Sequence, residues 1–485
     1  MIPSPLRGEG RLRAPAFARM KVEKPKNMNS TNTVTNLEAS DQLDIKKEIE
    51  FFATSCEELF NYAKNKGASQ AEIGVSKDLG LSVSVRNEEI ETLEYNRDNS
   101  FGITIYLGKQ KGVATTSDLS KKALHQAVDA ALNIAKYTQP DPYSGLADET
   151  LMAKNPRDLD LDYPMGIDAE SAKQIALECE SYGLDFSSRV TNSEGASFNS
   201  HRNIRYYANS HGFSVATPST RHSLSCVLLA ENESGKQRDH WYSISRDGND
   251  LDGGKLVGEK AAQRTVARLN ARQIKTQKAK ILFTPEMARS LIGNFKAAIS
   301  GTNIYRKSSF LQESLGQQVF PEFLSMNEKP FIKKGLASAW CDNEGLATKE
   351  QFIVENGKLN TFLLNSYSAR KLDRQPTGHC GGIHNLQISD SGIDFDQLVK
   401  HMDKGLIVTE MMGQGVNMIT GDYSRGASGF WVEKGEIQYF VEEITIAGNL
   451  IDMFKNVIAV GNDLDHRSSI LTGSWLLPEM MIAGA

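Results

Sequence analysis

Residues 413–449 read GQGVNMITGDYSRGASGFWVEKGEIQYFVEEITIAGN and are the most informative stretch of the chain. The first half of this stretch is dense in glycine, and the second half has two apolar arms on either side of a glycine-containing turn, which is a hairpin signal. A second segment of the same kind, FIVENGKLNTFL at 352–363, carries an Asn-Gly pair at its turn. Two similar hairpins predict a β-rich body, a sandwich or a barrel, in this part of the chain.

One strand and one helix precede the β-rich region. Residues 280–283 read KILF and predict a strand, after which Thr284 is a helix N-cap and Pro285 occupies the first helical position. The apolar residues that follow recur at helical spacing, and they are Met287, Leu291, Ile292, Phe295 and Ile299. We therefore predict a β-rich C-terminal domain over 276–485 that opens with one helix.

The first half of the chain predicts two smaller units that mix helices and strands. Apolar residues at three- and four-residue steps predict helices over 43–66 and 120–137, and period-two alternation predicts strands near 81–85 and 103–107. The fold class is therefore α+β. The predicted boundaries are a disordered leader or mis-assigned start at 1–41, an N-terminal α+β domain at 42–139, a linker at 140–164 and a middle α+β domain at 165–275.

Composition excludes several classes of protein. The 485 residues include 55 Lys and Arg against 60 Asp and Glu, a net charge of −5 without long runs of one sign, so nucleic acid is not an expected partner. No apolar run is long enough to span a membrane and none resembles a signal peptide, so we expect a cytoplasmic protein without a membrane partner. Five scattered cysteines without a C-x-x-C pair argue against a disulfide framework.

Several further motifs follow one another in a fixed order. They are TNSEGASFNSH at 191–201, STRHSLS at 219–225, IYRKSSFL at 304–311, SYSARKL at 366–372, TGHCGGIHN at 377–385 and VGND at 460–463. Together with 413–449 they resemble the PmbA proteins, also called TldE, of the TldD/PmbA metallopeptidase family. The resemblance implies a cytosolic heterodimeric peptidase in which a TldD-type subunit carries zinc and a PmbA-type subunit is its partner.

The zinc motif of TldD-type subunits is absent from this chain. A helical zinc peptidase needs two imidazoles on one helix face, a glutamate base and a third ligand, yet none of the nine histidines here is followed by glutamate. The resemblance aligns the H-E-x-x-x-H motif with KILFTPEMARSLIGNF, which puts Pro285 and Ser290 at the histidine positions and Glu286 at the glutamate. The family's third ligand, a cysteine, would fall near Thr472 and Gly473. We therefore predict no metal and no catalytic residue in this chain, with zinc in the TldD-like partner.

The remaining metal candidates are His379, Cys380 and His384 in TGHCGGIHN. Two imidazoles and a thiol could form part of a zinc or copper site, but the segment is rich in glycine and lacks a fourth ligand. A loop that shapes a cleft is the favoured interpretation. We also treat Tyr423 and Arg425 as candidates for contact with substrate or partner, because an arginine between glycines could hold a carboxylate; a turn that links strands is the alternative.

Other histidines carry weaker signals. His201, His211 and His222 lie among serines and asparagines on predicted strands, where hydrogen-bonded structural roles are favoured. Cys226 would share a strand face with His222, and core packing is favoured over a nucleophilic pair.

The resemblance implies the function of a non-catalytic subunit that shapes a cavity for unfolded proteins or peptide precursors. Addition of the peptide as a β-strand is the expected binding mode, because it holds the main chain without demanding a particular sequence. The expected partners are a TldD-like subunit and an unfolded peptide, with a homodimer when the chain is alone. The alternatives are an autonomous hydrolase that uses His379, Cys380 and His384, and a binding scaffold without a role in proteolysis.

Overall fold

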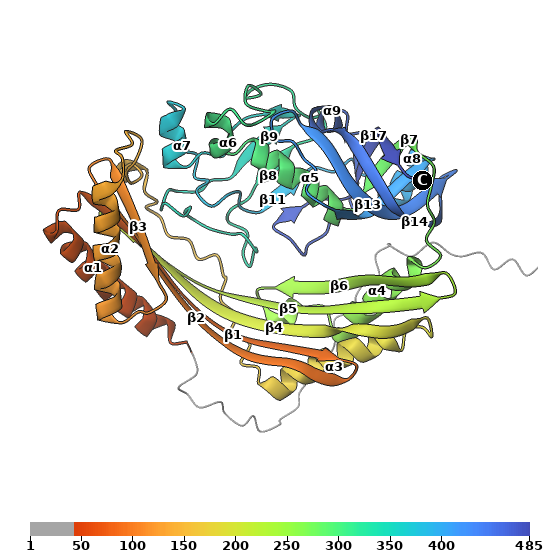
Figure 1. Ribbon diagram of the computed structural model, residues 1–485, viewed down its shortest axis with the longest axis horizontal. Coiled ribbons are helices and arrows are strands. Elements are labelled where there is room, and N and C mark those ends of the chain that lie inside the picture. Colours follow the sequence, from red (N-terminus) through yellow and green to blue (C-terminus); the bar gives the residue numbers. More distant parts are fainter. Residues whose placement is uncertain (1–42) are drawn as a thin grey trace, which may run out of the picture.

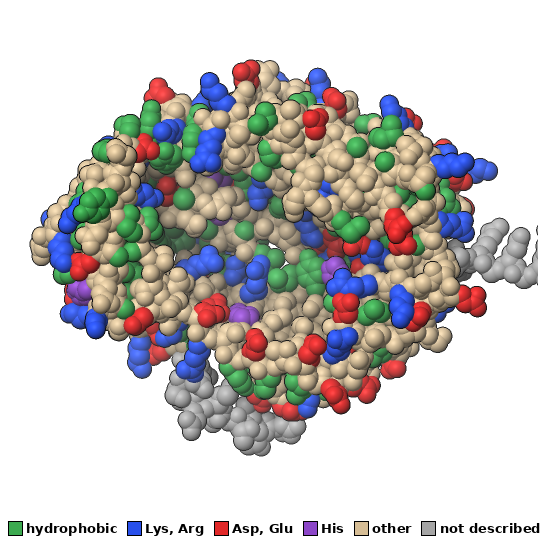
Figure 2. Space-filling view, in the orientation of Figure 1, with side chains coloured by type: hydrophobic (Ala, Val, Ile, Leu, Met, Phe, Trp, Pro, Cys, Tyr) green, Lys and Arg blue, Asp and Glu red, His purple; other side chains and the backbone are tan. Residues whose placement is uncertain are grey.

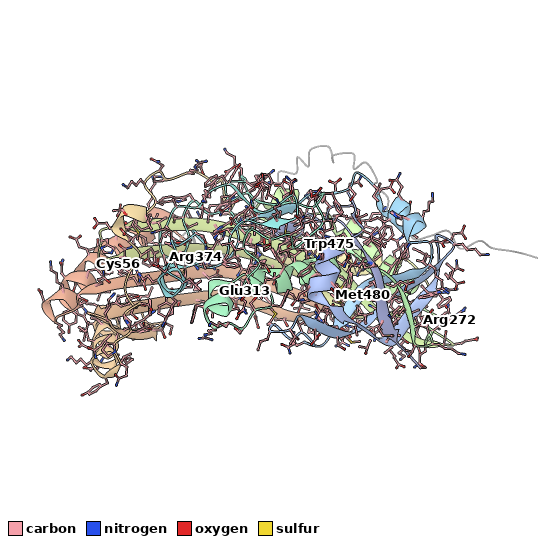
Figure 3. All side chains as sticks on the ribbon, turned by 90° about the horizontal axis from the view of Figure 1, so that it is seen from above. Cys56, Arg272, Glu313, Arg374, Trp475 and Met480 are labelled. Carbon is pink, nitrogen blue, oxygen red and sulfur yellow. The ribbon has the colours of Figure 1, made fainter. Side chains whose placement is uncertain are left out.

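The computed structural model describes residues 43–485, and the leader predicted over 1–41 lies outside them. A long curved sheet forms one half of the molecule, and the C-terminal region lies over its concave side (Figure 1). Seen from above in Figure 3, Cys56 and Arg272 lie toward opposite ends of the molecule, with Trp475 between them. Within the described residues, no helix combines the length and the hydrophobicity needed to cross a membrane.

The long sheet consists of six antiparallel strands in the order β3-β2-β1-β4-β5-β6. These strands are β1 (Gln70–Arg86), β2 (Glu89–Leu107), β3 (Gln110–Thr116), β4 (Val190–Asn209), β5 (Ser214–Asn232) and β6 (Gly235–Ser245). Strand β1 pairs with β4, with Val75 opposite Tyr206. Strands from 70–116 and from 190–245 therefore share one sheet.

Helices cover the convex side of this sheet (Figure 1). They are α1 (Ile45–Asn65), α2 (Lys121–Tyr137), α3 (Ala169–Leu184) and α4 (Gly254–Ala267). Helix α1 begins at Asp44, whose carboxylate accepts a hydrogen bond from the Lys47 N–H, and it stops before Gly67, which has a φ of +97°. The helices predicted over 43–66 and 120–137 are confirmed.

The two faces of the sheet differ in chemistry because side chains alternate along a strand. On the helix-covered face, the odd-numbered residues of β1 and the even-numbered residues of β4 and β5 are mostly apolar and buried. The opposite face, here called the inner face, is largely polar, and its central residues are Ser76, Asp78, Ser82, Asn199, His201, Asn203, Arg205, Thr217, Ser219, Arg221 and Ser223. Figure 2 shows that the molecule is hollowed between this sheet and the C-terminal region, with Lys, Arg and His side chains inside the hollow.

The C-terminal region contains a closed five-stranded barrel. Its strands follow the order β14-β13-β12-β7-β17, and β14 pairs back onto β17. They are β7 (Gln277–Phe283), β12 (Gly405–Met412), β13 (Asp422–Glu433), β14 (Glu436–Asn449) and β17 (Trp475–Ala483), to which β15 (Ala459–Val460) is added at the side. The hairpin predicted around 430–441 is the β13–β14 pair, and the α+β class with a barrel-like C-terminal body is confirmed.

A smaller sheet and several short helices complete this region. The sheet has the order β10-β9-β8-β11-β16, from β8 (Met326–Glu328), β9 (Gln351–Glu355), β10 (Lys358–Leu359), β11 (Leu386–Ile388) and β16 (Ile470–Leu471). The short helices are α6 (Gly301–Tyr305), α7 (Ser366–Lys371), α8 (Phe395–Met402) and α9 (Leu450–Lys455). Strands β9 and β10 form the second predicted hairpin, and Asn356 and Gly357 at its turn both have positive φ, as a type I′ turn requires.

Helix α5 (Pro285–Ala298) follows β7 and positions the candidate site. Thr284 is its N-cap and Pro285 its first residue, as predicted, but the Thr284 hydroxyl donates to the Val408 carbonyl at 3.2 Å instead of capping the helix. On the buried side of α5, Phe295 makes edge contacts with Phe320 and Phe454, at ring-centroid distances of 5.1 and 6.0 Å. This packing fixes α5 in the main core, so the polar residues of its first turns have a defined direction.

Candidate functional site

Glu286 in the first turn of α5 lies between two arginines from distant parts of the chain. Arg264 Nη1, from α4, donates to one carboxylate oxygen at 3.2 Å, and Arg467 Nη2, from the segment after β15, donates to the other at 2.8 Å. Burial acts to raise the pKa of Glu286, but the charges of Arg264 and Arg467 outweigh it and lower that pKa. The carboxylate is therefore ionised at neutral pH, with both oxygens engaged.

The two arginines belong to a wider network of charges. Asp465 pairs with Arg467 at 2.9 Å and with Arg289 at 2.8 Å, and Asp239 of β6 pairs with Arg264 at 3.2 Å. The Arg467 guanidinium also lies over the ring of Trp241, 3.5 Å from its centroid. Side chains from α4, α5, β6 and the segment after β15 thus meet at this point, which ties the sheet to the barrel region.

The residues at the third-ligand position cannot supply a thiolate. Thr472 is fully buried, and its hydroxyl accepts a hydrogen bond from the Trp475 indole N–H at 2.8 Å. A Cβ at Gly473 would lie 1.9 Å from the Gly461 carbonyl oxygen, so no side chain fits there. Zinc requires nitrogen, sulfur or carboxylate ligands, and this set offers a proline, a serine, a threonine and a glycine around a carboxylate already held by two guanidinium groups. The residues present therefore do not fit the metal that the family resemblance implies for its TldD-type subunits.

Arg425 and Ser290, two residues that the sequence suggested separately, lie side by side. Arg425 Nη1, from β13, donates to Ser290 Oγ on α5 at 3.1 Å. The Arg425 Nε is buried and has no hydrogen-bond partner within the described residues. Arg425 is thus positioned against the degenerate metal motif, with donor capacity left over.

Tyr423 has a different environment from Arg425. Its side chain is 1% exposed, and its hydroxyl donates to Met411 Sδ at 2.9 Å. The residue forms part of the wall of a surface groove of about 730 Å³, formed mainly by the loop before β13. The groove is lined by Asn303, Ser308, Gln414, Gly415, Val416, Asn417, Met418, Ile419, Asp422, Tyr423 and Ser424.

His379 and His384 both contact Glu328, the last residue of β8. His379 Nε2 lies 2.9 Å from one carboxylate oxygen of Glu328, and His384 Nδ1 lies 3.0 Å from the other. Burial acts to raise the pKa of Glu328, but hydrogen bonds from both histidines outweigh it and lower that pKa to about 2. The glutamate had no signal in the sequence, because it lies about fifty residues before the histidines.

Cys380 does not join these histidines. Its backbone N–H donates to Asp342 at 3.0 Å, and burial, together with the charges of Glu344 and Asp342, raises the pKa of its thiol. Across residues 43–485, no group of three or more His, Cys, Asp or Glu side chains is arranged to hold a metal ion. The geometry therefore gives this loop a packing role around Glu328.

His222 and His201 both form hydrogen bonds within the long sheet and its neighbours. His222 is buried, with one ring nitrogen 2.9 Å from Ser200 Oγ and the other 3.0 Å from the Tyr163 carbonyl oxygen. Burial lowers the pKa of His222. His201 lies on the inner face, where its Nδ1 is 3.0 Å from Asp78. Cys226 is fully buried on the helix-covered face.

Comparison with known proteins agrees with this architecture over most of the described chain. Three family profiles match in order, described as PmbA/TldA metallopeptidase domain 1 at residues 71–135, the central domain at 162–269 and the C-terminal domain at 276–484. The chain is 50% identical to Metalloprotease PmbA of Escherichia coli O157:H7 over 414 residues, which cover 85% of this chain and 92% of that protein. It is 49% identical to the Metalloprotease PmbA homolog of Haemophilus influenzae over 420 residues, covering 86% and 93% of the two chains.

A solved structure shows the same fold. The crystal structure of TldE from Thermococcus kodakarensis superposes with a TM-score of 0.78 at 20% sequence identity, and the match covers 89% of this chain and 100% of that one. The matched profiles span nearly all of the described residues, and the identity to the bacterial relatives is high over most of both chains. The chain therefore belongs to the PmbA/TldA metallopeptidase family.

Proposed function

We propose that this chain is the subunit of a TldD/TldE-type metallopeptidase that does not itself cleave peptide bonds. In this proposal a TldD-like partner supplies the zinc, the glutamate base and the cleavage, and this chain completes the cavity and holds the substrate. The substrates are unfolded proteins or peptide precursors.

The observation that carries the proposal is the environment of Glu286. A glutamate acts as a general base in a metallopeptidase only beside a metal-bound water, and it must have a free oxygen with which to take the proton. Here one oxygen is 3.2 Å from Arg264 and the other 2.8 Å from Arg467. Two guanidinium groups at this place would also repel a divalent cation.

The hollow beside the inner face supports a role in holding a peptide. Its sheet face carries serine, threonine and asparagine side chains, which can accept and donate hydrogen bonds without selecting one sequence. Arg425, whose Nη1 donates to Ser290 Oγ, adds a guanidinium group that can bind a peptide carbonyl or carboxylate beside Ser290. Addition of the peptide as a β-strand would also bind without selecting one sequence, because it uses hydrogen bonds to the peptide main chain.

Metal analysis of the purified chain tests the proposal. We expect well below one zinc per chain after purification without chelator and brief dialysis, because no preformed ligand set is present to retain the ion. About one zinc per chain, lost in a His379→Ala or His384→Ala variant, would instead assign a metal site to the TGHCGGIHN loop. A Lys122→Ala variant, changed at an exposed residue of α2, is the matched control for zinc loss caused by mutation alone.

A further inference from the structure

Three arginines lie on or beside the inner face of the long sheet, and none of them is paired with a carboxylate among residues 43–485. They are Arg205 on β4, Arg221 on β5 and Arg246 just after β6. Arg205 and Arg221 are odd-numbered, so their side chains leave the sheet on the face opposite the helices. Both are exposed, and among residues 43–485 neither forms an ion pair with Asp or Glu.

Arg246 is held by hydrogen bonds, and its positive charge lies near Arg205 and Arg221. Its guanidinium donates to the carbonyl oxygens of Thr220 at 3.0 Å and Leu336 at 2.9 Å, so its hydrogen bonds go to neutral groups. Burial, and then the charges of Arg221 and Arg205, lower the pKa of Arg246 to about 10. Arg205 and Arg221 are therefore both close enough to Arg246 for their charges to act on it.

Asp78, an acidic residue on this part of the inner face, already has a hydrogen-bond partner. Asp78 on β1 lies opposite Asn203 on β4, and its Oδ1 is 3.0 Å from His201 Nδ1. The His201 ring lies directly over Gly80, where an added Cβ would be 2.2 Å from it, so the glycine allows the ring to lie against β1. Asp78 thus faces His201, and the positive charge of Arg205 and Arg221 is left for a ligand.

We infer that Arg205 and Arg221 form a carboxylate-binding site for an extended peptide segment in the hollow. This inference rests on the proposed function only in taking a peptide as the ligand. A guanidinium group binds a carboxylate through two parallel hydrogen bonds, which neither lysine nor an amide reproduces. The whole chain has a net charge of −5, so a local positive site gives acidic segments a preference that the surface as a whole would not.

The spacing of the two arginines sets the spacing of the carboxylates. Arg205 lies opposite Thr217, four residues along β5 from Arg221. At about 3.3 Å per residue, the two Cα positions are roughly 13 Å apart along the sheet, the separation of residues i and i+4 in an extended peptide. The site therefore fits a segment that carries two carboxylates four residues apart, one of which can be a chain end.

Peptide binding to the isolated full-length chain tests this inference without partner or zinc. The probes are fluorescein-labelled nine-residue Ser/Thr/Gly peptides with an amidated C-terminus, which carry either two Glu or two Gln four residues apart, measured by anisotropy. We expect the Glu peptide to bind about tenfold more tightly than the Gln peptide, because hydrogen bonds between a guanidinium group and a carboxylate are stronger than those to a neutral amide. A Gln peptide with a free C-terminus shows whether a terminal carboxylate satisfies the same site.

Two variants locate the site on the protein. Arg205→Gln and Arg221→Gln should each weaken binding of the Glu peptide about threefold, because each removes one of the two pairs that give the tenfold preference, and should leave binding of the Gln peptide unchanged. Arg189→Gln is the matched control, since Arg189 is exposed just before β4, at the opposite end of that strand from Arg205. Equal binding of Glu and Gln peptides to the unmodified chain, no binding of either, or an equal loss in the Arg189 control would overturn the inference. None of these results depends on whether the chain assembles with a TldD-like subunit.

Discussion

The Glu286 carboxylate and the Arg467 guanidinium are joined by a 2.8 Å hydrogen bond across the junction between α5 and the segment after β15. Arg264 holds the other oxygen of the same carboxylate, so the motif glutamate is a structural anion in this chain. A charge network therefore surrounds the glutamate that the resemblance aligns with the zinc motif of TldD-type subunits. The network joins the sheet to the barrel region, so its ion pairs should contribute to the stability of the fold.

Loss of Arg264 should destabilise the fold strongly. Arg264→Ala leaves Glu286 and Asp239 with one cationic partner fewer in a mostly buried site, and we expect a loss of about 3 kcal/mol in the free energy of unfolding. Urea denaturation followed by circular dichroism measures this loss. Lys255→Ala is the control on the same helix, because its ion pair with Glu259 is solvent-exposed and should contribute little. Equal stability of the Arg264 variant and the control would contradict a structural role for the network.

Gly473, at the third-ligand position, should not accept a side chain. Gly473→Ala would place a Cβ 1.9 Å from the Gly461 carbonyl oxygen, and we expect it to cost about 3 kcal/mol or more. Gly293→Ala, in the middle of α5 with open space around it, should instead stabilise the chain by about 0.5–1 kcal/mol. Thermal unfolding of both variants measures these changes in stability. A Gly473→Ala variant as stable as the unmodified chain would show that the segment around Gly473 has room for a side chain.

Local signals predicted much of the fold. Thr284 and Pro285 marked the start of α5, and the Asn356–Gly357 pair marked the turn between β9 and β10, because caps and turns depend on a few neighbouring residues. The pairing of β1 with β4 had no such signal. It joins strands separated by two further strands, two helices and a linker, and alternation of apolar and polar residues does not indicate which strand pairs with which.

The candidate site was less predictable, because the residues that contact one another there are far apart in the sequence. Alignment of the motif identified Pro285 and Ser290 as unable to bind zinc, but it did not reveal that Arg264 and Arg467 hold Glu286. These arginines come from segments about twenty residues before the glutamate and about 180 residues after it, so only the folded chain brings them together. The burial of Tyr423 depends likewise on packing by the β12 segment, through Met411.

The Glu328 cluster should make stability depend on pH in the acid range. The pKa of Glu328 is about 2 in the folded chain against an ordinary value of 4.5, so its contribution is present above pH 4.5 and is lost as the pH falls toward 2. We expect Glu328→Gln to cost about 3 kcal/mol at pH 6, with the difference narrowing as the pH falls below 4.5.

Free energies of unfolding in urea between pH 6 and pH 3 measure this narrowing. Glu350→Gln, changed at an exposed glutamate, is the control and should show a small difference from the unmodified chain throughout. A Glu328→Gln deficit that stays constant down to pH 3 would mean that the two histidines do not hold the pKa of this carboxylate down.

Turnover of an unfolded peptide by mixed subunits tests the central claim most directly. The assay combines this chain with a TldD-like subunit that bears the H-E-x-x-x-H motif, with each subunit alone as a control. We expect cleavage only in the mixture, nearly unchanged by Glu286→Gln in this chain and abolished by the same change in the partner's motif glutamate. Cleavage by this chain alone, or loss of cleavage with Glu286→Gln while the partner's glutamate is dispensable, would contradict the assignment of catalysis to the partner.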